Sequence, residues 1–315
     1  MGQDYGWAGK ILWIDLNEKK VSIERIPNEW KKNFLGGRGM NVKILFDNVK
    51  AGTDPLSPEN VAVLGTGVLT GTLVGGRCDA TALSPLTGIL GDANAGGHWG
   101  AEFKFAGYDT IVFTGRSDKP VYIWIDDDTV EIRDASGLWG KNFWETTEQV
   151  RRNENDPSVQ VIGIGQAGEN LVKYAAVMNS FARANGRTGI GAVLGSKNVK
   201  CIATRGTKGV KIARPKEFLR LITKMYKDSV GTPMYDWYPK YGTPMLTEHK
   251  NMLETVPVKN WSMNTLDDVD AMSGETFLKK FATKNRACHG CFFHCDHYFR
   301  SGKLEGLGVE YETMN

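Results

Sequence analysis

The placement of glycine constrains the fold of this chain more than any other feature of its sequence. The 315 residues include 37 glycines, and most of them precede residue 210. They separate short apolar or alternating runs of the kind that forms β-strands, and no low-complexity period accompanies them. Glycine at this density marks either a β domain with many tight turns or places where the backbone approaches something closely. We expect strands at residues 10–16, 61–64, 110–114, 121–125 and 159–164.

Helical patterns are few before residue 210 and prevail after it. Residues 38–49 and 143–153 are predicted to form the early helices, from the spacing of their apolar residues and from the break that precedes the second. Later, Pro215 begins a segment with apolar residues at helical spacing, which is a good start signal. Residues 273–283 are predicted to form a further helix.

This change from strand patterns to helical patterns predicts an α+β protein with a domain boundary near residue 210. Residues 1–210 would form a β-rich domain, and residues 211–315 would begin a mainly helical domain. The length also suits two domains of ordinary size.

Charge and hydropathy exclude several classes of function. The net charge of +3 is too small to favour binding to nucleic acid or to a membrane surface. No window approaches the roughly 18 consecutive apolar residues that span a bilayer. The first residues contain neither the basic nor the apolar region of a signal peptide. We therefore expect a cytoplasmic protein.

Three of the five cysteines lie within eight residues. Cys288, Cys291 and Cys295 form a C-x2-C-x3-C run, and clustering of this kind without a signal peptide favours metal binding over a disulfide framework. Thiolates at this spacing can bind a [4Fe–4S] cluster or zinc, and either would need a fourth ligand. For zinc, His297 is a sensible candidate. The remaining cysteines, Cys78 and Cys201, are expected to be core thiols.

A possible dinucleotide-binding motif is better explained as a turn. Gly163, Gly165 and Gly168 fit G-x-G-x-x-G after an apolar run. A Rossmann fold also needs an acidic residue about 20 positions later, and none occurs between Glu169 and Glu217. We therefore predict a glycine turn between strands.

Three other glycine-rich segments place bare backbone beside arginine or asparagine. They cover residues 69–88, 94–109 and 183–198. Backbone N–H groups can line up on phosphate only where no side chain intervenes, and arginine adds charge-assisted hydrogen bonds. The combination is suited to gripping a flat, anionic ligand.

Together with residues 54–60, 131–136 and 167–170, these segments resemble the N-terminal domain of the aldehyde ferredoxin oxidoreductases, which are tungsten- or molybdenum-pterin enzymes. The resemblance extends through residues 257–260 and the cysteine run to residues 310–312. It implies a β domain that forms the base for a bis-pterin tungsten cofactor, with mainly helical domains closing over it and a [4Fe–4S] cluster nearby.

The resemblance also implies roles for individual residues. Arg77 would lie between the pterin and the cluster, and Glu312 would assist proton transfer near the metal. Asn94 and Ala184 would help to hold a magnesium ion that bridges the pterin phosphates. The pterin phosphates would be lined by Asn94, Gly96, Arg183, Ala184, Gly186 and Arg187, and the cluster would be bound by Cys288, Cys291 and Cys295.

The activity implied by the resemblance is the oxidation of an aldehyde to a carboxylic acid. Electrons would pass through the cluster to ferredoxin or to an iron–sulfur subunit. Family members are longer than this chain, and their fourth cluster cysteine and substrate pocket lie in the part that has no counterpart here. We therefore expect a second chain that supplies that part, or a truncated copy.

Other functions remain open at this stage. The chain could be a non-catalytic iron–sulfur subunit for electron transfer or scaffolding, or a zinc-stabilised binding module. It could also resemble the class II benzoyl-CoA reductases of the same family. That branch places a protein cysteine on tungsten, and no cysteine lies between residues 202 and 287 to supply one.

Overall fold

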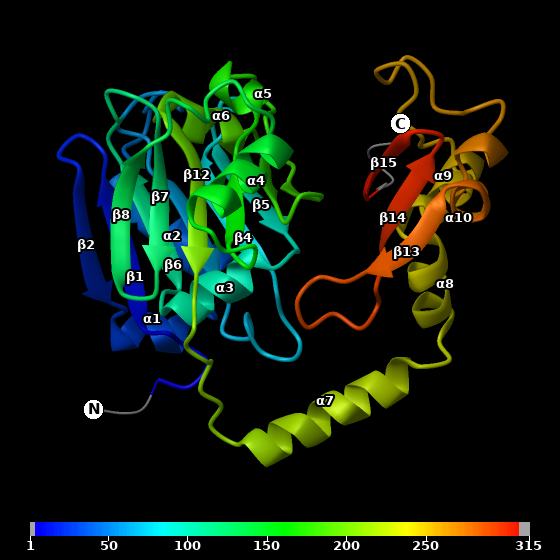
Figure 1. Ribbon diagram of the computed structural model, residues 1–315, viewed down its shortest axis with the longest axis horizontal. Coiled ribbons are helices and arrows are strands. Elements are labelled where there is room, and N and C mark those ends of the chain that lie inside the picture. Colours follow the sequence, from blue (N-terminus) through cyan, green and yellow to red (C-terminus); the bar gives the residue numbers. More distant parts are fainter. Residues whose placement is uncertain (1–3, 309–315) are drawn as a thin grey trace. The chain divides into compact units, whose positions relative to one another are not determined.

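The computed structural model describes residues 4–308 and divides the chain into two compact units, Met1–Ala213 and Arg214–Asn315. Figure 1 shows the elements of both units. Each unit is described by itself.

The first unit contains two six-stranded sheets. The first sheet has the order β2-β1-β6-β3-β4-β5, in which β1 and β6 are parallel and all other neighbours are antiparallel. Its strands are β1 (Lys10–Asp15), β2 (Lys20–Arg25), β3 (Ala62–Thr66), β4 (Cys78–Leu83), β5 (Leu90–Ala95) and β6 (Thr110–Thr114).

The second sheet has the order β11-β10-β9-β12-β7-β8, and only β12 and β7 are parallel. Its strands are β7 (Val121–Asp126), β8 (Thr129–Asp134), β9 (Gln160–Gly163), β10 (Val177–Asn179), β11 (Arg183–Asn185) and β12 (Val199–Arg205).

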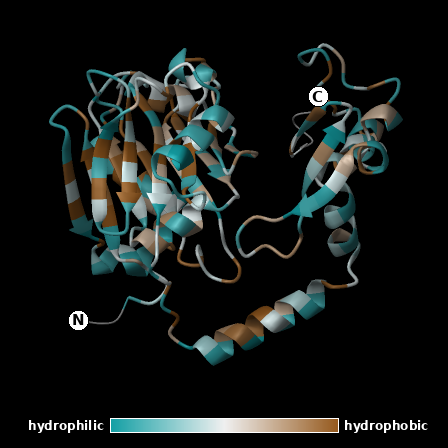
Figure 2. Ribbon diagram, viewed as in Figure 1, coloured by the Kyte–Doolittle hydropathy of each residue, from teal (hydrophilic) through white to brown (hydrophobic). Residues whose placement is uncertain are grey.

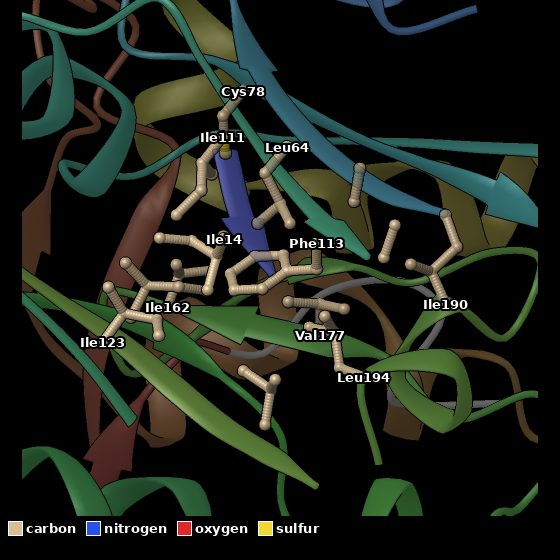
Figure 3. Packing of buried hydrophobic residues seen from close by; sticks show 14 of the residues in the cluster. Ile14, Leu64, Cys78, Ile111, Phe113, Ile123, Ile162, Val177, Ile190 and Leu194 are labelled. Atoms are coloured by element: carbon tan, nitrogen blue, oxygen red, sulfur yellow. The ribbon is translucent and has the colours of Figure 1, made fainter. Parts of the chain in front are cut away.

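The hydrophobic core lies between these sheets. Figure 3 shows Ile14 and Phe113 of the first sheet packed with Ile123 and Ile162 of the second, and all four side chains are fully buried. Burying a side chain of this size contributes roughly 1.5–3 kcal/mol, so this shared core holds the sheets face to face.

Helices lie both between the two sheets and on their outer faces. The helices α3 (Trp99–Ala106) and α6 (Ile190–Ser196) contribute buried residues to the core between the sheets. Outside the first sheet, α2 (Arg38–Asn48) packs on β3 and β4, and outside the second, α4 (Phe143–Asn153) packs on β9. The remaining helices are α1 (Asn28–Asn33) and α5 (Gln166–Glu169). The start of α4 is fixed by a capping box, in which Asn142 and Glu145 each bond the other's backbone N–H at 2.9 and 3.0 Å.

The second unit combines short helices with a three-stranded antiparallel sheet of order β13-β14-β15. Among its described residues, only Val256 and Phe277 are buried hydrophobic side chains. No residue of α7 is buried, and Figure 2 shows the hydrophobic residues along that helix. The elements are α7 (Pro215–Ser229), α8 (Pro233–Tyr241), η1 (Thr243–Met245), α9 (Leu246–Met252), η2 (Asp270–Met272), α10 (Gly274–Lys280), β13 (Ala282–Arg286), β14 (Asp296–Ser301) and β15 (Leu304–Leu307).

The structure confirms the α+β class and the five predicted strands, with shifts at their ends. It also confirms helices at residues 38–48, 143–153 and 215–229. The helix predicted for residues 273–283 ends earlier, at Lys280, because Ala282–Arg286 pairs with β14 instead. No helix among residues 4–308 has the length and apolar character that a membrane crossing requires.

Candidate functional site

Two of the glycine-rich segments meet where the edge strands of the sheets come together. The strands are β5, at the end of the first sheet, and β11, at the end of the second. Asn185 of β11 is fully buried, and its Nδ2 donates hydrogen bonds to the carbonyl oxygens of Ala93 at 2.6 Å and Cys78 at 3.3 Å. This one amide therefore joins the second sheet to both β4 and β5. We call the region the β5–β11 seam.

Two further buried side chains fasten the backbone that follows β5. Asn179 Nδ2 donates to the carbonyl oxygen of Gly96 at 2.6 Å, and the backbone N–H of His98 donates to Ser180 Oγ at 2.8 Å. Ser180 and Phe181 both have positive φ, at 51° and 69°, which is costly for residues with a Cβ. These hydrogen bonds hold the strained turn in place.

The glycines at the seam have two different functions. Gly97 has a φ of 108°, and a Cβ there would overlap Asn179 Oδ1, so the fold itself requires glycine. A Cβ at Gly186 would meet only the Ala184 Cβ, at 3.9 Å. The fold does not require glycine at 186, which leaves exposed, bare backbone open to a group from outside the chain.

The predicted residues Arg77 and Asn94 are in direct contact. Arg77 Nη1 donates to Asn94 Oδ1, and Asn94 Nδ2 donates to Asp79 Oδ1 at 2.8 Å. Arg77 is exposed and Asn94 is half-buried. Burial raises the pKa of Asp79, and the hydrogen bond from Asn94 partly offsets that rise. The seam thus presents an exposed guanidinium that is hydrogen-bonded to Asn94.

The other predicted pterin residues lie on the β11 side of the seam. Arg183 begins β11 opposite Asn179, and Ala184 and Arg187 are exposed. Because Asn185 ties this segment to Ala93, the structure brings residues 94–96 and 183–187 to one place. The donors and the open backbone fit a flat ligand that carries phosphates.

Sequence reasoning missed Asp79, Asn179, Ser180 and Asn185. The hydrogen bonds by which they join the seam are to partners 15–107 positions away in the sequence. The one available signal is that Asn179, Ser180 and Asn185 are small polar residues near Gly186, as in many ordinary turns.

The three clustered cysteines lie in one loop of the second unit. Cys288, Cys291 and Cys295 are half-buried and lie between β13 and β14, whose facing ends pair Arg286 with Asp296. Across the described part of the chain, residues 4–308, no three His, Cys, Asp or Glu side chains are arranged to hold a metal ion. The loop therefore supplies thiol donors suited to iron or zinc, but does not gather them around one point.

Aromatic contacts hold the same loop. Phe292 packs edge-on against Tyr226 of α7 at 5.7 Å between ring centroids, and Phe293 packs against Tyr238 of α8 at 5.6 Å. Such pairs stabilise by about 0.5–1.5 kcal/mol each beyond area burial. The loop is thus anchored by side chains between its cysteines.

The imidazole of His297 forms a hydrogen bond with the backbone at the end of α8. Its Nε2 lies 3.0 Å from the carbonyl oxygen of Pro239, in the last turn of α8, and its ring stands edge-on to Phe277. The side chain is 1% exposed. The contact with Pro239 engages one of the two ring nitrogens that His297 could offer to zinc.

The remaining sequence candidates are located as follows. Cys78 and Cys201 are buried core thiols, and burial raises the pKa of each to about 12. Gly163 ends β9, which pairs only with antiparallel neighbours, so the structure confirms the rejection of a Rossmann motif. Glu312 lies outside the described residues.

Comparison with known families matches both units. The model described as "Aldehyde ferredoxin oxidoreductase, N-terminal domain" matches residues 11–206, and "Aldehyde ferredoxin oxidoreductase, domains 2 & 3" matches residues 220–315.

Individual relatives agree. The tungsten-containing aldehyde ferredoxin oxidoreductase of Pyrococcus furiosus is 41% identical over 98% of this chain and 52% of its own length. The aliphatic sulfonate oxidoreductase, WOR-like subunit, of the same organism is 32% identical over 96% of this chain and 51% of its own length. The chain thus spans about half the length of the curated relatives that it matches.

A solved structure also matches. It is titled "Active site complex BamBC of Benzoyl Coenzyme A reductase in complex with 1,5 Dienoyl-CoA". The TM-score is 0.84 at 32% identity, and the match covers 97% of this chain and 49% of that chain.

Proposed function

The chain belongs to the aldehyde ferredoxin oxidoreductase family, and from this membership we propose that it is the cofactor-binding part of a tungsten-dependent enzyme that oxidises aldehydes to carboxylic acids. The observation that carries the proposal is the β5–β11 seam, where Asn185 fastens two glycine-rich segments together and Gly186 leaves open backbone.

At this seam the chain's own residues would bind and orient a tungsten or molybdenum pterin. Arg77, Arg183 and Arg187 supply positive charge, and the exposed backbone at Ala184 and Gly186 is accessible to phosphate. Asn94 and Ala184 would help to hold a bridging magnesium ion. The metal of this cofactor, when bound, would supply the two-electron redox chemistry, while the protein would position the cofactor and exclude water.

The cysteine loop would serve electron transfer. Cys288, Cys291 and Cys295 would bind a [4Fe–4S] cluster together with one ligand from outside the described residues. Ferredoxin, or an iron–sulfur subunit, would receive the electrons. We assign proton transfer to Glu312, and we expect a second chain to complete the substrate pocket.

A second candidate follows from the solved structure that matches. Its title names a benzoyl-CoA reductase complex, which favours a subunit of a comparable reductase as the alternative. The absence of cysteine between residues 202 and 287 favours aldehyde oxidation, if the reductase branch requires a cysteine on tungsten.

Metal analysis of the natively isolated protein tests the proposal. Tungsten or molybdenum together with iron is the expected result. Iron alone would favour the electron-transfer subunit, and zinc alone would overturn the proposal in favour of a binding module. Co-purification of a second chain that carries the fourth cluster cysteine would support the assembly.

A pair of glycine variants tests the seam directly. Gly186→Val is expected to lower pterin and tungsten content at least tenfold, because the side chain occupies the backbone that would face the ligand. Gly137→Val is the matched control, since a Cβ at Gly137 meets nothing within 4 Å and one at Gly186 meets only the Ala184 Cβ, at 3.9 Å. Equal cofactor content in the two variants would contradict the seam as the pterin site.

A further inference from the structure

We propose that Asp79 is a positioning residue, which fixes the Asn94 amide and, through it, aims the Arg77 guanidinium at the β5–β11 seam. This inference rests on the proposed function, because it assumes that Arg77 meets an anionic group there. No motif in the sequence singles out Asp79.

The pairing of β4 with β5 places these groups side by side. Asp79 lies directly opposite Asn94 in the antiparallel register, and both side chains point away from the core between the sheets. Asp79 Oδ1 accepts from Asn94 Nδ2 at 2.8 Å, and Asn94 Oδ1 accepts from Arg77 Nη1. The three residues therefore form one chain of hydrogen bonds.

At its other end, this series of hydrogen bonds reaches the N-terminus of α2. The backbone N–H of Arg38, the first residue of α2, donates to Asp79 Oδ2 at 3.2 Å. A helix N-terminus favours a nearby carboxylate. Gly37 has a φ of 52°, and a Cβ there would come within 2.6 Å of the same oxygen, so the chain passes Asp79 closely.

The neighbouring carboxylate, that of Asp92, has hydrogen-bond partners of its own. Asp92 accepts from Arg38 Nε at 2.6 Å and from Thr81 Oγ1 at 2.9 Å. The Arg38 side chain is thus directed to Asp92, whereas only its backbone reaches Asp79. This division leaves Asp79 Oδ1 to Asn94.

The carboxylate sets the direction of the amide. An ionised carboxylate only accepts hydrogen bonds, whereas an asparagine side chain has one end that donates and one that accepts. Asp79 therefore selects the orientation in which Asn94 Oδ1 faces Arg77. The opposite orientation would turn two acceptors toward each other and leave the guanidinium without its acceptor.

Nuclear magnetic resonance of the 315-residue chain with ¹⁵N-labelled arginine tests this arrangement without any cofactor. A held guanidinium gives resolved, slowly exchanging Nη–H signals, and the Arg77 signal is assigned by its loss in Arg77→Lys. We expect the signal in the parent chain and its loss in Asp79→Asn. Asparagine at position 79 has a single acceptor, so it cannot accept from both Arg38 and Asn94 in the same way.

The double variant Asp79→Asn/Asn94→Asp reverses the polarity of the pair. The amide at 79 can accept from Arg38 and donate to the new carboxylate, which can accept from Arg77. We expect the Arg77 signal to return. Asp92→Asn is the matched control and should leave the signal in place. A purely structural role for Asp79 would lower the thermal midpoint without this specific rescue.

Three results would overturn the inference: no held Arg77 signal in the parent chain, a signal that persists in Asp79→Asn, or a folded double variant that fails to restore it. Titration with inorganic pyrophosphate addresses the function of the arrangement. We expect Asp79→Asn to weaken binding about fivefold. Failure of the parent chain to bind pyrophosphate would instead count against the proposed function of the seam.

Discussion

Lys197 is a fully buried lysine, and no carboxylate among residues 4–308 lies at hydrogen-bonding distance from it. Its Nζ donates to the carbonyl oxygens of Gly115 at 2.8 Å and Pro58 at 3.2 Å. Burial, reinforced by the charge of Arg116 and opposed by Glu59, lowers the pKa of Lys197 to about 7. The residue joins the loop before β3 to the end of β6, mainly as a neutral amine above that pH.

This pKa predicts that stability depends on pH. Between about pH 7 and the ordinary lysine pKa of 10.5, the unfolded state binds a proton that the folded state does not, so stability rises with pH. We expect the parent chain to gain free energy of unfolding relative to Lys197→Met from pH 7 to pH 9, with a slope of up to about 1.4 kcal/mol per unit. Chemical denaturation at both pH values measures it, and a constant difference would contradict it.

Asp109 and Lys104 form an ion pair in which both side chains have no exposed surface. Asp109 also accepts from the backbone N–H groups of Gly9 at 2.6 Å and Ala8 at 3.2 Å, which ties the start of the chain to α3. Asp109→Asn would leave a buried charge without its partner, and we expect it to lower the free energy of unfolding by about 3–5 kcal/mol. Asp128→Asn, which breaks only exposed pairs, should cost about 1 kcal/mol or less by the same measurement.

The sequence predicts which residues could contact a ligand, but it does not predict which residues hold them in place. Arg77, Asn94 and Gly186 lie in segments whose composition already indicated a ligand. Asp79 and Asn185 were missed, because each acts only through partners that strand pairing and sheet packing bring close. Such contacts depend on the finished fold, and local patterns do not encode them.

At the scale of elements, the turn at Gly97 offers a test of how β5 leads into α3. Gly97→Ala would overlap Asn179 Oδ1 and displace the bond from Asn179 to Gly96, and we expect a loss of about 3 kcal/mol. Gly88→Ala also has positive φ but meets nothing within 4 Å, so it should cost about 1 kcal/mol. Thermal and urea denaturation of both variants separate overlap from backbone strain, and equal losses would show that no overlap occurs.

The strands that the sequence predicted differ in chemistry from those that it did not. β6 and β7 are rich in valine, isoleucine and aromatic residues, which signal a strand by themselves. β4 and β5 read CDATAL and LGDANA, and such small and polar residues give no strand signal. They form strands because they pair with each other and face the core with Cys78, Ala80, Ala93 and Ala95.

At the scale of the whole molecule, the two units should respond differently to protease. α7 has no buried residue and carries Lys216, Arg220, Lys224 and Lys227, so local opening there should be easy. We expect brief trypsin treatment to cut α7 first and to release a stable fragment that contains Met1–Ala213. Arg151 and Arg152 of α4, a helix with four buried residues, should resist under the same conditions. Mass spectrometry of the first products checks the order, and initial cleavage in α4 would refute it.

The β5–β11 seam also bears on the order of folding and cofactor insertion. Its two sides lie about ninety positions apart in the sequence and belong to different sheets, and Asn185 can reach Ala93 only after both sheets have formed and packed. A partly synthesised chain that ends before β11 would have one side of the proposed binding surface and nothing opposite it. We therefore expect cofactor insertion to follow the folding of the first unit, so that any factor that delivers the cofactor would meet a folded acceptor.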